Sequence, residues 1–265
     1  MTVEATPDVV VFDACGIHVE FPELIEFLIK VRGMCPDVRM VFLHFDPWIK
    51  QQWAFMRAIA TLFDAVWCPF PAAEVLQTPE LRDKVTFIPF PVGVGLDELP
   101  VVERQDVAAF QGAVAAPNFS RAFWMVSLQL AQSRVESRVT THLDDGLDPI
   151  DSYRHYLSRF QTVERLVNFS LRSDGSRIVT GRTFEAIYAG TCLLQEHADD
   201  LAYYFVPFLH YLPFTTFEDL QKAFTYCEQE PKEALAVRER AQEFYLEKYE
   251  DRKLVRYLEH VLYGT

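Results

Sequence analysis

The residues best suited to chemistry lie in one polar segment, SDGSRIVTGRTFEAIYAGTCLLQE, which occupies positions 173–196. This segment predicts a glycine-bearing loop that leads from a strand into a helix. Backbone N–H groups at the start of such a helix have no partner within it and, together with the helix dipole, form a site for anions. Arg177 and Arg182 bracket the turn and could add the charge and the forked donors that suit a diphosphate.

Glu185 lies three residues after Arg182, on an adjacent face of the same predicted helical turn. A carboxylate at this place could accept hydrogen bonds from two vicinal hydroxyls, such as those of a ribose. The same spacing also fits an ion pair between Arg182 and Glu185 on the helix surface, with Gly181 and Gly190 simply bounding the helix. Spacing alone therefore leaves both interpretations open.

The strands and helices that position these residues can be predicted from two series of apolar runs. Short apolar runs alternate with longer amphipathic stretches along the chain, a pattern typical of parallel strands covered by helices on both faces. The predicted strands are 7–14, 37–46, 65–70 and 85–93 in the first series, and 109–114, 137–143, 165–170 and 191–197 in the second. The predicted helices are 21–34, 49–63, 120–132, 150–160, 182–190, 217–229, 231–248 and 251–262.

The two series predict two Rossmann-like domains. Alternating strands and helices of this kind form doubly wound α/β domains, which bind ligands outside the carboxyl ends of their strands. The polar, acidic segment 95–107 is the best candidate for a linker. We therefore expect an α/β protein whose two parallel sheets face a cleft, with the first domain shorter than the second.

Composition and charge limit the partners that such a protein could bind. The chain of 265 residues is 50% hydrophobic and 14% aromatic, which suffices for two packed domains. Its 25 Lys and Arg against 38 Asp and Glu give a formal net charge of −13, which opposes broad binding to nucleic acids or to an anionic membrane surface. Any bound anion should therefore be small and held locally by a few arginines.

The sequence shows no pattern typical of a targeting signal or of a metal site. No run approaches the roughly 18 apolar residues of a membrane span, and the N-terminus lacks the pattern of a signal peptide. The five widely spaced cysteines suit a reducing compartment, so we expect a cytoplasmic protein. The seven histidines show no metal-ligand spacing, and no dinucleotide or P-loop glycine motif occurs. We therefore expect neither a metal nor a cofactor.

Residues 182–196, R-T-F-E-A-I-Y-A-G-T-C-L-L-Q-E, resemble the signature helix of GT-B glycosyltransferases, above all the CgeB/YkvP-like group related to families 4 and 1. Members of that group read R-x-F-E-A-x-A-x-G-x-x-L-L, and here Tyr188 takes a position usually held by a small residue. The stretch 210–220 is similar to the sequence that follows the signature helix in members of this group. The resemblance covers most of residues 110–263, strongly in 177–196 and loosely elsewhere.

The resemblance implies a GT-B-like fold, with an acceptor-side domain in residues 1–98, a donor domain in 107–248 and a last helix, 249–265, that packs back on the first domain. It also implies a nucleotide-sugar donor, with Glu185 on its ribose and Arg182, with Arg177, on its diphosphate. The full donor-binding set is Gly112, Arg121, Arg177, Thr180, Gly181, Arg182, Thr183 and Glu185. Gly112 and Arg121 are secondary members, because a strand-ending glycine and a solvated arginine explain them equally well.

The resemblance also implies a shortened first domain, whose acceptor site is either minimal or completed by a partner chain or a second subunit of a homo-oligomer. His44 and Asp46, at the carboxyl end of a predicted strand, resemble an element of related transferases. They are candidates to contact the transferred sugar or to orient an acceptor hydroxyl, and Asp13, His18 or Asp46 could deprotonate that hydroxyl, as an inverting transferase requires. A retaining enzyme needs no such base, and His44 also fits a core histidine.

Three classes of function follow. The first is a metal-independent glycosyltransferase that moves a sugar from a nucleoside-diphosphate sugar to a glycan, lipid-linked or small-molecule acceptor, with Arg182 stabilising the leaving diphosphate. Metal-dependent GT-A transferases use a D-x-D motif, which this sequence lacks. The second is a non-catalytic GT-B-like subunit that binds sugar nucleotides or assembles a larger transferase. The third, a sugar-nucleotide epimerase of the same fold, should carry more acidic catalytic residues.

Overall fold

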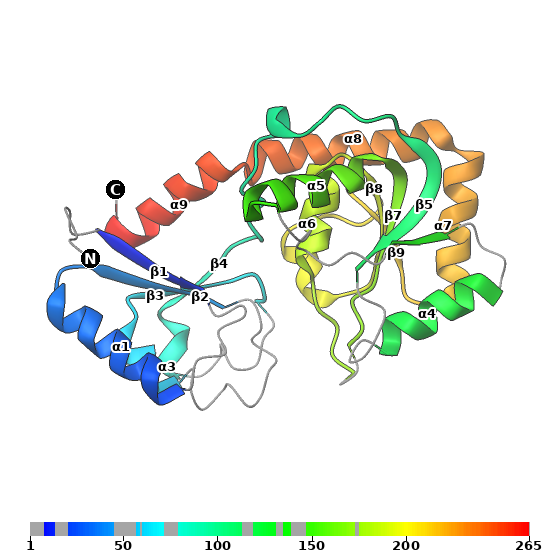
Figure 1. Ribbon diagram of the computed structural model, residues 1–265. Coiled ribbons are helices and arrows are strands. Elements are labelled where there is room, and N and C mark those ends of the chain that lie inside the picture. Colours follow the sequence, from blue (N-terminus) through cyan, green and yellow to red (C-terminus); the bar gives the residue numbers. More distant parts are fainter. Residues whose placement is uncertain are drawn as a thin grey trace. The chain divides into compact units, whose positions relative to one another are not determined.

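The computed structural model describes residues 8–13, 21–44, 57, 58, 60–71, 79–112, 119–130, 135–138, 147–172 and 175–264 of the chain. The chain divides into two compact units, one formed by Met1–Pro89 with Leu254–Thr265 and the other by Phe90–Lys253. Each unit contains one parallel sheet (Figure 1). The prediction of two Rossmann-like α/β domains is therefore confirmed.

The sheet of the first unit has the order β1-β2-β3-β4, and all neighbouring strands are parallel. Its strands are β1 (Val9–Asp13), β2 (Arg39–Leu43), β3 (Ala65–Cys68) and β4 (Val85–Phe87). All four residues of β3 are buried, as expected of an apolar strand covered on both faces. Helix α1 (Phe21–Met34) connects the first two strands, and α9 (Asp251–Tyr263) packs Leu254 and Leu258 onto the sheet.

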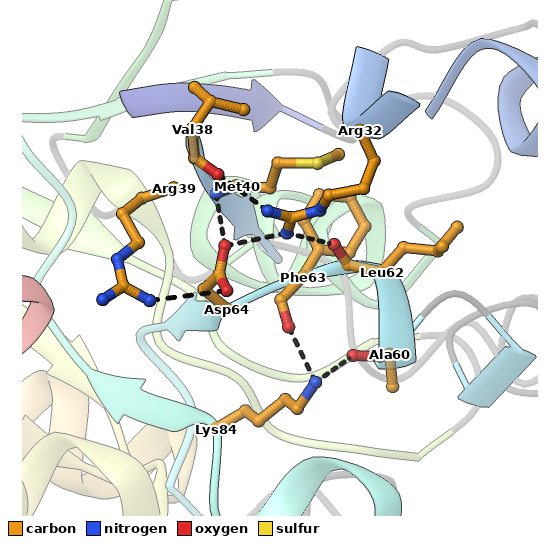
Figure 2. Close-up of polar contacts among 9 residues, drawn as sticks. All are labelled: Arg32, Val38, Arg39, Met40, Ala60, Leu62, Phe63, Asp64 and Lys84. Atoms are coloured by element: carbon orange, nitrogen blue, oxygen red, sulfur yellow. Dashed lines mark hydrogen bonds and ion pairs between the residues drawn. The ribbon is translucent and has the colours of Figure 1, made fainter. Parts of the chain in front are cut away.

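A polar cluster ties the amino ends of β2 and β3 together (Figure 2). Asp64, directly before β3, accepts hydrogen bonds at Oδ2 from the backbone N–H of Met40 and from Arg32 of α1, both at 2.8 Å, and pairs with Arg39 at 3.7 Å. Burial alone would raise the pKa of Asp64, but the bonds from Arg32 and Met40 outweigh it and lower this pKa below its ordinary value. The cluster lies at the edge of the sheet opposite the carboxyl ends, so we assign it a structural role.

The sheet of the second unit has the order β6-β5-β7-β8-β9, again with parallel neighbours. Its strands are β5 (Gln105–Gln111), β6 (Val135–Arg138), β7 (Val163–Asn168), β8 (Cys192–Glu196) and β9 (Leu212–Phe214). Its helices are α4 (Phe119–Leu130), α5 (Pro149–Gln161), α6 (Gly181–Tyr188), α7 (Phe217–Gln229) and α8 (Pro231–Lys248). The strand order reverses between β5 and β7, which is where open α/β sheets bind ligands.

Local signals explain where two helices of this unit begin. Asp148 accepts a 2.9 Å hydrogen bond from the N–H of Ile150, and Pro149 occupies the first position of α5. Thr216 and Asp219 form a reciprocal capping box at the start of α7. Helix α6 differs, because no side chain caps its first turn.

The structure differs from the expected elements in a few places. The apolar pattern does not predict strand β9, because Pro213 interrupts its short run. Proline is tolerated there because β9 is an edge strand. Strand β5 begins at Gln105, inside the predicted linker 95–107. The apolar pattern does not indicate this start, because the first two residues of the strand are polar and exposed. Most of the predicted helix 49–63 lies outside the described residues. Further short helices are α3 (Pro79–Arg82), η2 (Ala60–Leu62), η4 (Leu96–Glu98) and η5 (Asp199–Tyr203).

Candidate functional site

Polar residues gather where β5 and β7 end, at the reversal of strand order in the second unit. Gly112 directly follows β5, Asn168 is the last residue of β7, and Arg182 lies in the first turn of α6. Arg182 donates from Nε to Oδ1 of Asn168 at 3.1 Å, and its guanidinium carbon lies 5.7 Å from the centre of the Phe110 ring. The arginine side chain is therefore held at the carboxyl ends of two neighbouring strands.

Gly112 allows Arg182 to come this close to the end of β5. Its φ of +145° belongs to a region that favours glycine. A Cβ atom at this position would lie 2.7 Å from Nη1 and 3.3 Å from Cζ of Arg182. Both the backbone conformation and the contact therefore call for glycine, and these two predicted donor residues lie side by side.

Positive charge accumulates beside this contact. Burial, together with the charges of Arg182 and Arg172, lowers the pKa of Arg121 on α4 to about 10. The guanidinium group of Arg121 is therefore close enough to those of Arg182 and Arg172 to be repelled by their charge, in a protein whose net charge is −13. A bound diphosphate would relieve this repulsion, and forked guanidinium donors match its oxygens.

A buried hydrogen-bond network supports the start of α6. The hydroxyl of Thr180, the residue before the helix, lies 2.9 Å from Nδ2 of Asn168. The hydroxyl of Thr183 lies 3.1 Å from the same nitrogen and donates to Oε1 of Gln195 at 2.9 Å. Because both hydroxyls are committed to this network, they do not cap the helix. The first amides of α6, those of Gly181 and Arg182, therefore keep the anion-binding character of a helix start.

Glu185 is buried in the same helix, with only 9% of its surface exposed. The hydroxyls of Tyr153 and Tyr156, both on α5, donate to its Oε1 at 3.1 Å and to its Oε2 at 3.0 Å. Burial raises the pKa of Glu185, and the bond from Tyr156 and the charge of Arg182 partly offset this effect. Within the described residues no ion pair joins Arg182 to Glu185, so the surface ion pair that the spacing also allowed is not formed.

Gly181 leaves space beside this carboxylate. It is the first residue of α6, and a Cβ atom there would lie 3.8 Å both from Oε1 of Glu185 and from Cδ1 of Phe90. The carboxylate of Glu185 therefore folds back toward the start of its own helix. A ligand at the helix start could reach the amide groups and the carboxylate at the same time.

Arg177 lies in the loop between β7 and α6, where it forms an isolated antiparallel bridge with Leu171. It is exposed, and its side chain makes no hydrogen bond or ion pair with any other residue that the structure describes. The same loop is anchored by Glu196, whose Oε2 accepts from the N–H groups of Ser170 at 2.8 Å and Leu171 at 2.9 Å. The structure thus shows Arg182 in the site but no contact that brings Arg177 to it.

The predicted residues of the first unit fall into two groups. His44 directly follows β2 and is 1% exposed, and neither ring nitrogen has a hydrogen-bond partner among the described residues. Burial lowers its pKa to about 4, so its imidazole is neutral at neutral pH. Asp13 is the last residue of β1, beside Leu43 in the register, but its side chain is not described. Asp46 and His18 lie outside the described residues.

A cavity of about 520 Å³ lies beside β9 and α7, with His197, Phe208 and Tyr226 among its walls. None of the predicted donor residues lines it, so it does not coincide with the site around Arg182. In the described part of the chain, no three His, Cys, Asp or Glu residues come together as metal ligands. None of the helices in the described ranges is long and apolar enough to cross a membrane.

Sequence reasoning missed several residues that the structure places here. Asn168 ends β7 as a buried polar residue, and its position at the carboxyl end of an apolar strand was a signal that could have identified it. Arg172 follows the same strand. Tyr153 and Tyr156 belong to no motif, and only the packing of α5 beside α6 brings them to Glu185.

Comparisons with known proteins agree with this fold. The profile of a family described as glycosyl transferase-like matches residues 107–260. The structure of Alr3699/HepE from Anabaena in complex with UDP-glucose matches 97% of this chain and 79% of its own, with a TM-score of 0.62 and 9% identity. The structure of a glycosyltransferase from Rickettsia africae aligns with 97% of this chain and 76% of the Rickettsia chain, with a TM-score of 0.59 and 9% sequence identity. The structure of WaaG, a glycosyltransferase involved in lipopolysaccharide biosynthesis, aligns with 94% of this chain and 85% of the WaaG chain, with a TM-score of 0.56 and 12% sequence identity. No curated protein sequence matches significantly.

Proposed function

The chain belongs to the glycosyl transferase-like family, and on this premise we propose that it is a glycosyltransferase. It moves a sugar from a nucleoside-diphosphate sugar to a glycan, lipid-linked or small-molecule acceptor. The complexes of the Anabaena neighbour with UDP and with UDP-glucose support a donor of this class. The sequence of helix α6 supports a place near the CgeB/YkvP-like group.

One observation carries the proposal: Arg182 lies against Gly112 and Asn168 at the ends of β5 and β7, beside the uncapped start of α6. Backbone amides at a helix start and a guanidinium group together suit the two phosphates of a nucleoside diphosphate. Glu185, whose carboxylate folds back toward the same helix start, would accept the ribose hydroxyls.

The proposed reaction needs stabilisation of the leaving group. Negative charge grows on the diphosphate as its bond to the sugar breaks, and fixed positive charge at that point lowers the barrier. Arg182, with Arg121 and Arg172 close by, would supply this charge in place of a metal ion. We therefore expect transfer to continue in the presence of EDTA. Activity that EDTA abolishes and Mg²⁺ or Mn²⁺ restores would contradict metal independence.

The acceptor would be activated by residues of the first unit if the enzyme inverts the configuration of the sugar. A general base works best with a pKa near the operating pH. Burial lowers the pKa of His44 to about 4, well below that range. His44 is also buried, with 1% of its surface exposed, so it does not reach an acceptor hydroxyl, and the base would be Asp13, Asp46 or His18.

A thermal-shift panel of UDP, GDP, ADP and their sugar conjugates tests the proposal. One nucleoside diphosphate should stabilise the protein, by about 2.7 kcal/mol at a hundredfold excess over its Kd. Glu185→Ala should weaken this response, whereas Glu239→Ala, which alters an exposed carboxylate of α8, should respond like the wild type. Absence of any shift across the panel would overturn the proposal. Release of free sugar from the stabilising donor would separate an enzyme from a non-catalytic binding subunit.

A further inference from the structure

Two tyrosines of α5 hold the carboxylate of Glu185 from one side. Tyr153 and Tyr156 are three residues apart, so their side chains lie on one face of the helix. Their rings stack with centroids 5.9 Å apart and an interplanar angle of 19°. Each donates to a different oxygen of Glu185, Tyr153 to Oε1 at 3.1 Å and Tyr156 to Oε2 at 3.0 Å. The carboxylate is therefore fixed at both of its oxygens.

Tyr156 is itself fixed by its surroundings. The ring of Tyr156 packs edge-on against Phe160, with centroids 5.1 Å apart, and only 3% of the residue is exposed. Its backbone carbonyl accepts a 3.2 Å hydrogen bond from Nε2 of Gln111, the last residue of β5. The strand that leads to Gly112 therefore also anchors the helix that orients Glu185.

The carboxylate of Glu185 can accept further hydrogen bonds beside those from the two tyrosines. An ionised carboxylate offers about four lone-pair positions, two on each oxygen. The two tyrosine hydroxyls use one position on each oxygen, which leaves one more on each. Two vicinal hydroxyls, such as O2′ and O3′ of a ribose, need two acceptors placed in this way.

We propose that Tyr153 and Tyr156 are positioning residues that orient Glu185 to receive both hydroxyls of a ribose. This inference rests on the proposed function, because the ribose belongs to the nucleoside-diphosphate donor. The two hydroxyl bonds also keep the carboxylate in one rotamer, so the ligand does not have to order it on binding. Without these bonds Glu185 would remain buried but its carboxylate would lose its fixed direction.

The opposite arrangement makes a different prediction. If the tyrosines merely occupied the carboxylate until a ligand displaced them, removing their hydroxyls would free Glu185 and strengthen nucleotide binding. If they orient it, removing the hydroxyls weakens the recognition of ribose and leaves the recognition of phosphate unchanged. The two cases differ in the sign of the effect.

Isothermal titration with three ligands distinguishes them. The ligands are the nucleoside diphosphate that stabilises the wild type, its 2′,3′-dideoxy counterpart and inorganic diphosphate. The wild type should bind the ribonucleotide at least tenfold more tightly than the dideoxynucleotide. Tyr156→Phe and the double variant with Tyr153→Phe should lose most of this preference while their affinity for inorganic diphosphate stays the same. Tyr249→Phe removes a tyrosine hydroxyl bond to the carbonyl of Tyr204 instead, and should keep the preference.

The outcomes separate this inference from the function on which it rests. If the wild type binds no nucleotide, the proposed function is overturned and the inference with it. If it binds nucleotides but the tyrosine variants keep the full ribose preference, or bind the ribonucleotide more tightly, only the positioning role is overturned. Circular dichroism checks that each variant is folded. Tyr153→Phe, which alters the less buried tyrosine, provides the test alone if the double variant does not fold.

Discussion

The backbone of Gly112 and the guanidinium group of Arg182 are in such close contact that a Cβ atom at position 112 would lie 2.7 Å from Nη1. The two residues are 70 positions apart in the chain, and the contact joins the end of β5 to the start of α6. A methyl group at position 112 would therefore act on the arginine directly, by displacing its guanidinium group.

We expect Gly112→Ala to weaken binding of the nucleoside diphosphate about tenfold, which corresponds to about 1.4 kcal/mol. The reason is displacement of Arg182, added to the strain of alanine at a φ of +145°. Titration calorimetry measures the affinity for the nucleotide, and thermal unfolding measures the stability of the variant. Gly93→Ala is the matched control, because Gly93 also has a positive φ, +62°, but no atom within 4 Å of an added Cβ. Equal affinities of the two variants would contradict the role of the contact.

Gly181→Ala should separate binding from stability. An added Cβ meets its nearest atoms at 3.8 Å, an ordinary contact distance, so the free energy of unfolding should change by less than about 0.5 kcal/mol. The methyl group would nevertheless narrow the space between the helix start and Glu185, and nucleotide affinity should fall. Gly33→Ala on α1, where an added Cβ meets no atom within 4 Å, should leave the affinity as it is. Unchanged binding by Gly181→Ala would show that no ligand enters this space.

Asp64→Asn should destabilise the first unit without touching the candidate site. The variant loses a charge-assisted hydrogen bond from Arg32 and weakens the one from Met40, which we expect to cost about 1–2 kcal/mol (Figure 2). Since the folded protein lowers the pKa of Asp64 below its usual 3.8, this stabilisation is present above pH 3.8 and is lost as the pH falls through the lowered value. Urea unfolding of both proteins at neutral pH and near pH 3 measures the difference. A difference that persists unchanged at the lower pH would refute the explanation.

Because His44 is buried in its neutral form, the free energy of unfolding should decrease in mild acid. Its pKa is about 4 in the folded protein against 6.5 when exposed, so the unfolded chain binds more protons between these values. Stability should therefore fall by about 3 kcal/mol as the pH drops from 6.5 to 4, in addition to the effects of other groups. His44→Leu removes this component. Chemical denaturation across that range measures it, and parallel curves for the wild type and the variant would show that the imidazole is not buried.

Much of the fold follows from local patterns in the sequence. The amphipathic stretch 21–34 predicts α1 with the same bounds that the structure has, and apolar runs predict eight of the nine described strands. Strand β9 escapes such reasoning because three residues with a central proline carry almost no local signal. Its place is determined by pairing with β8, a contact between distant parts of the chain.

The candidate site is less accessible to sequence reasoning. Residue type and spacing identify Arg182 and Glu185, but the same spacing allows a surface ion pair. What separates the two is that Asn168 binds the arginine while Tyr153 and Tyr156 bind the carboxylate. These partners come from β7 and α5, and no local pattern shows that they meet at α6.

The affinity of Arg182→Gln for the nucleoside diphosphate that stabilises the wild type is the most direct test of the donor site. Loss of a charged hydrogen-bond donor costs about 1.5–3 kcal/mol, so titration calorimetry should show binding weakened by about tenfold to a hundredfold. Arg240→Gln, which removes an exposed arginine of α8, should bind like the wild type. Wild-type affinity in Arg182→Gln would contradict the assignment of this site to the diphosphate.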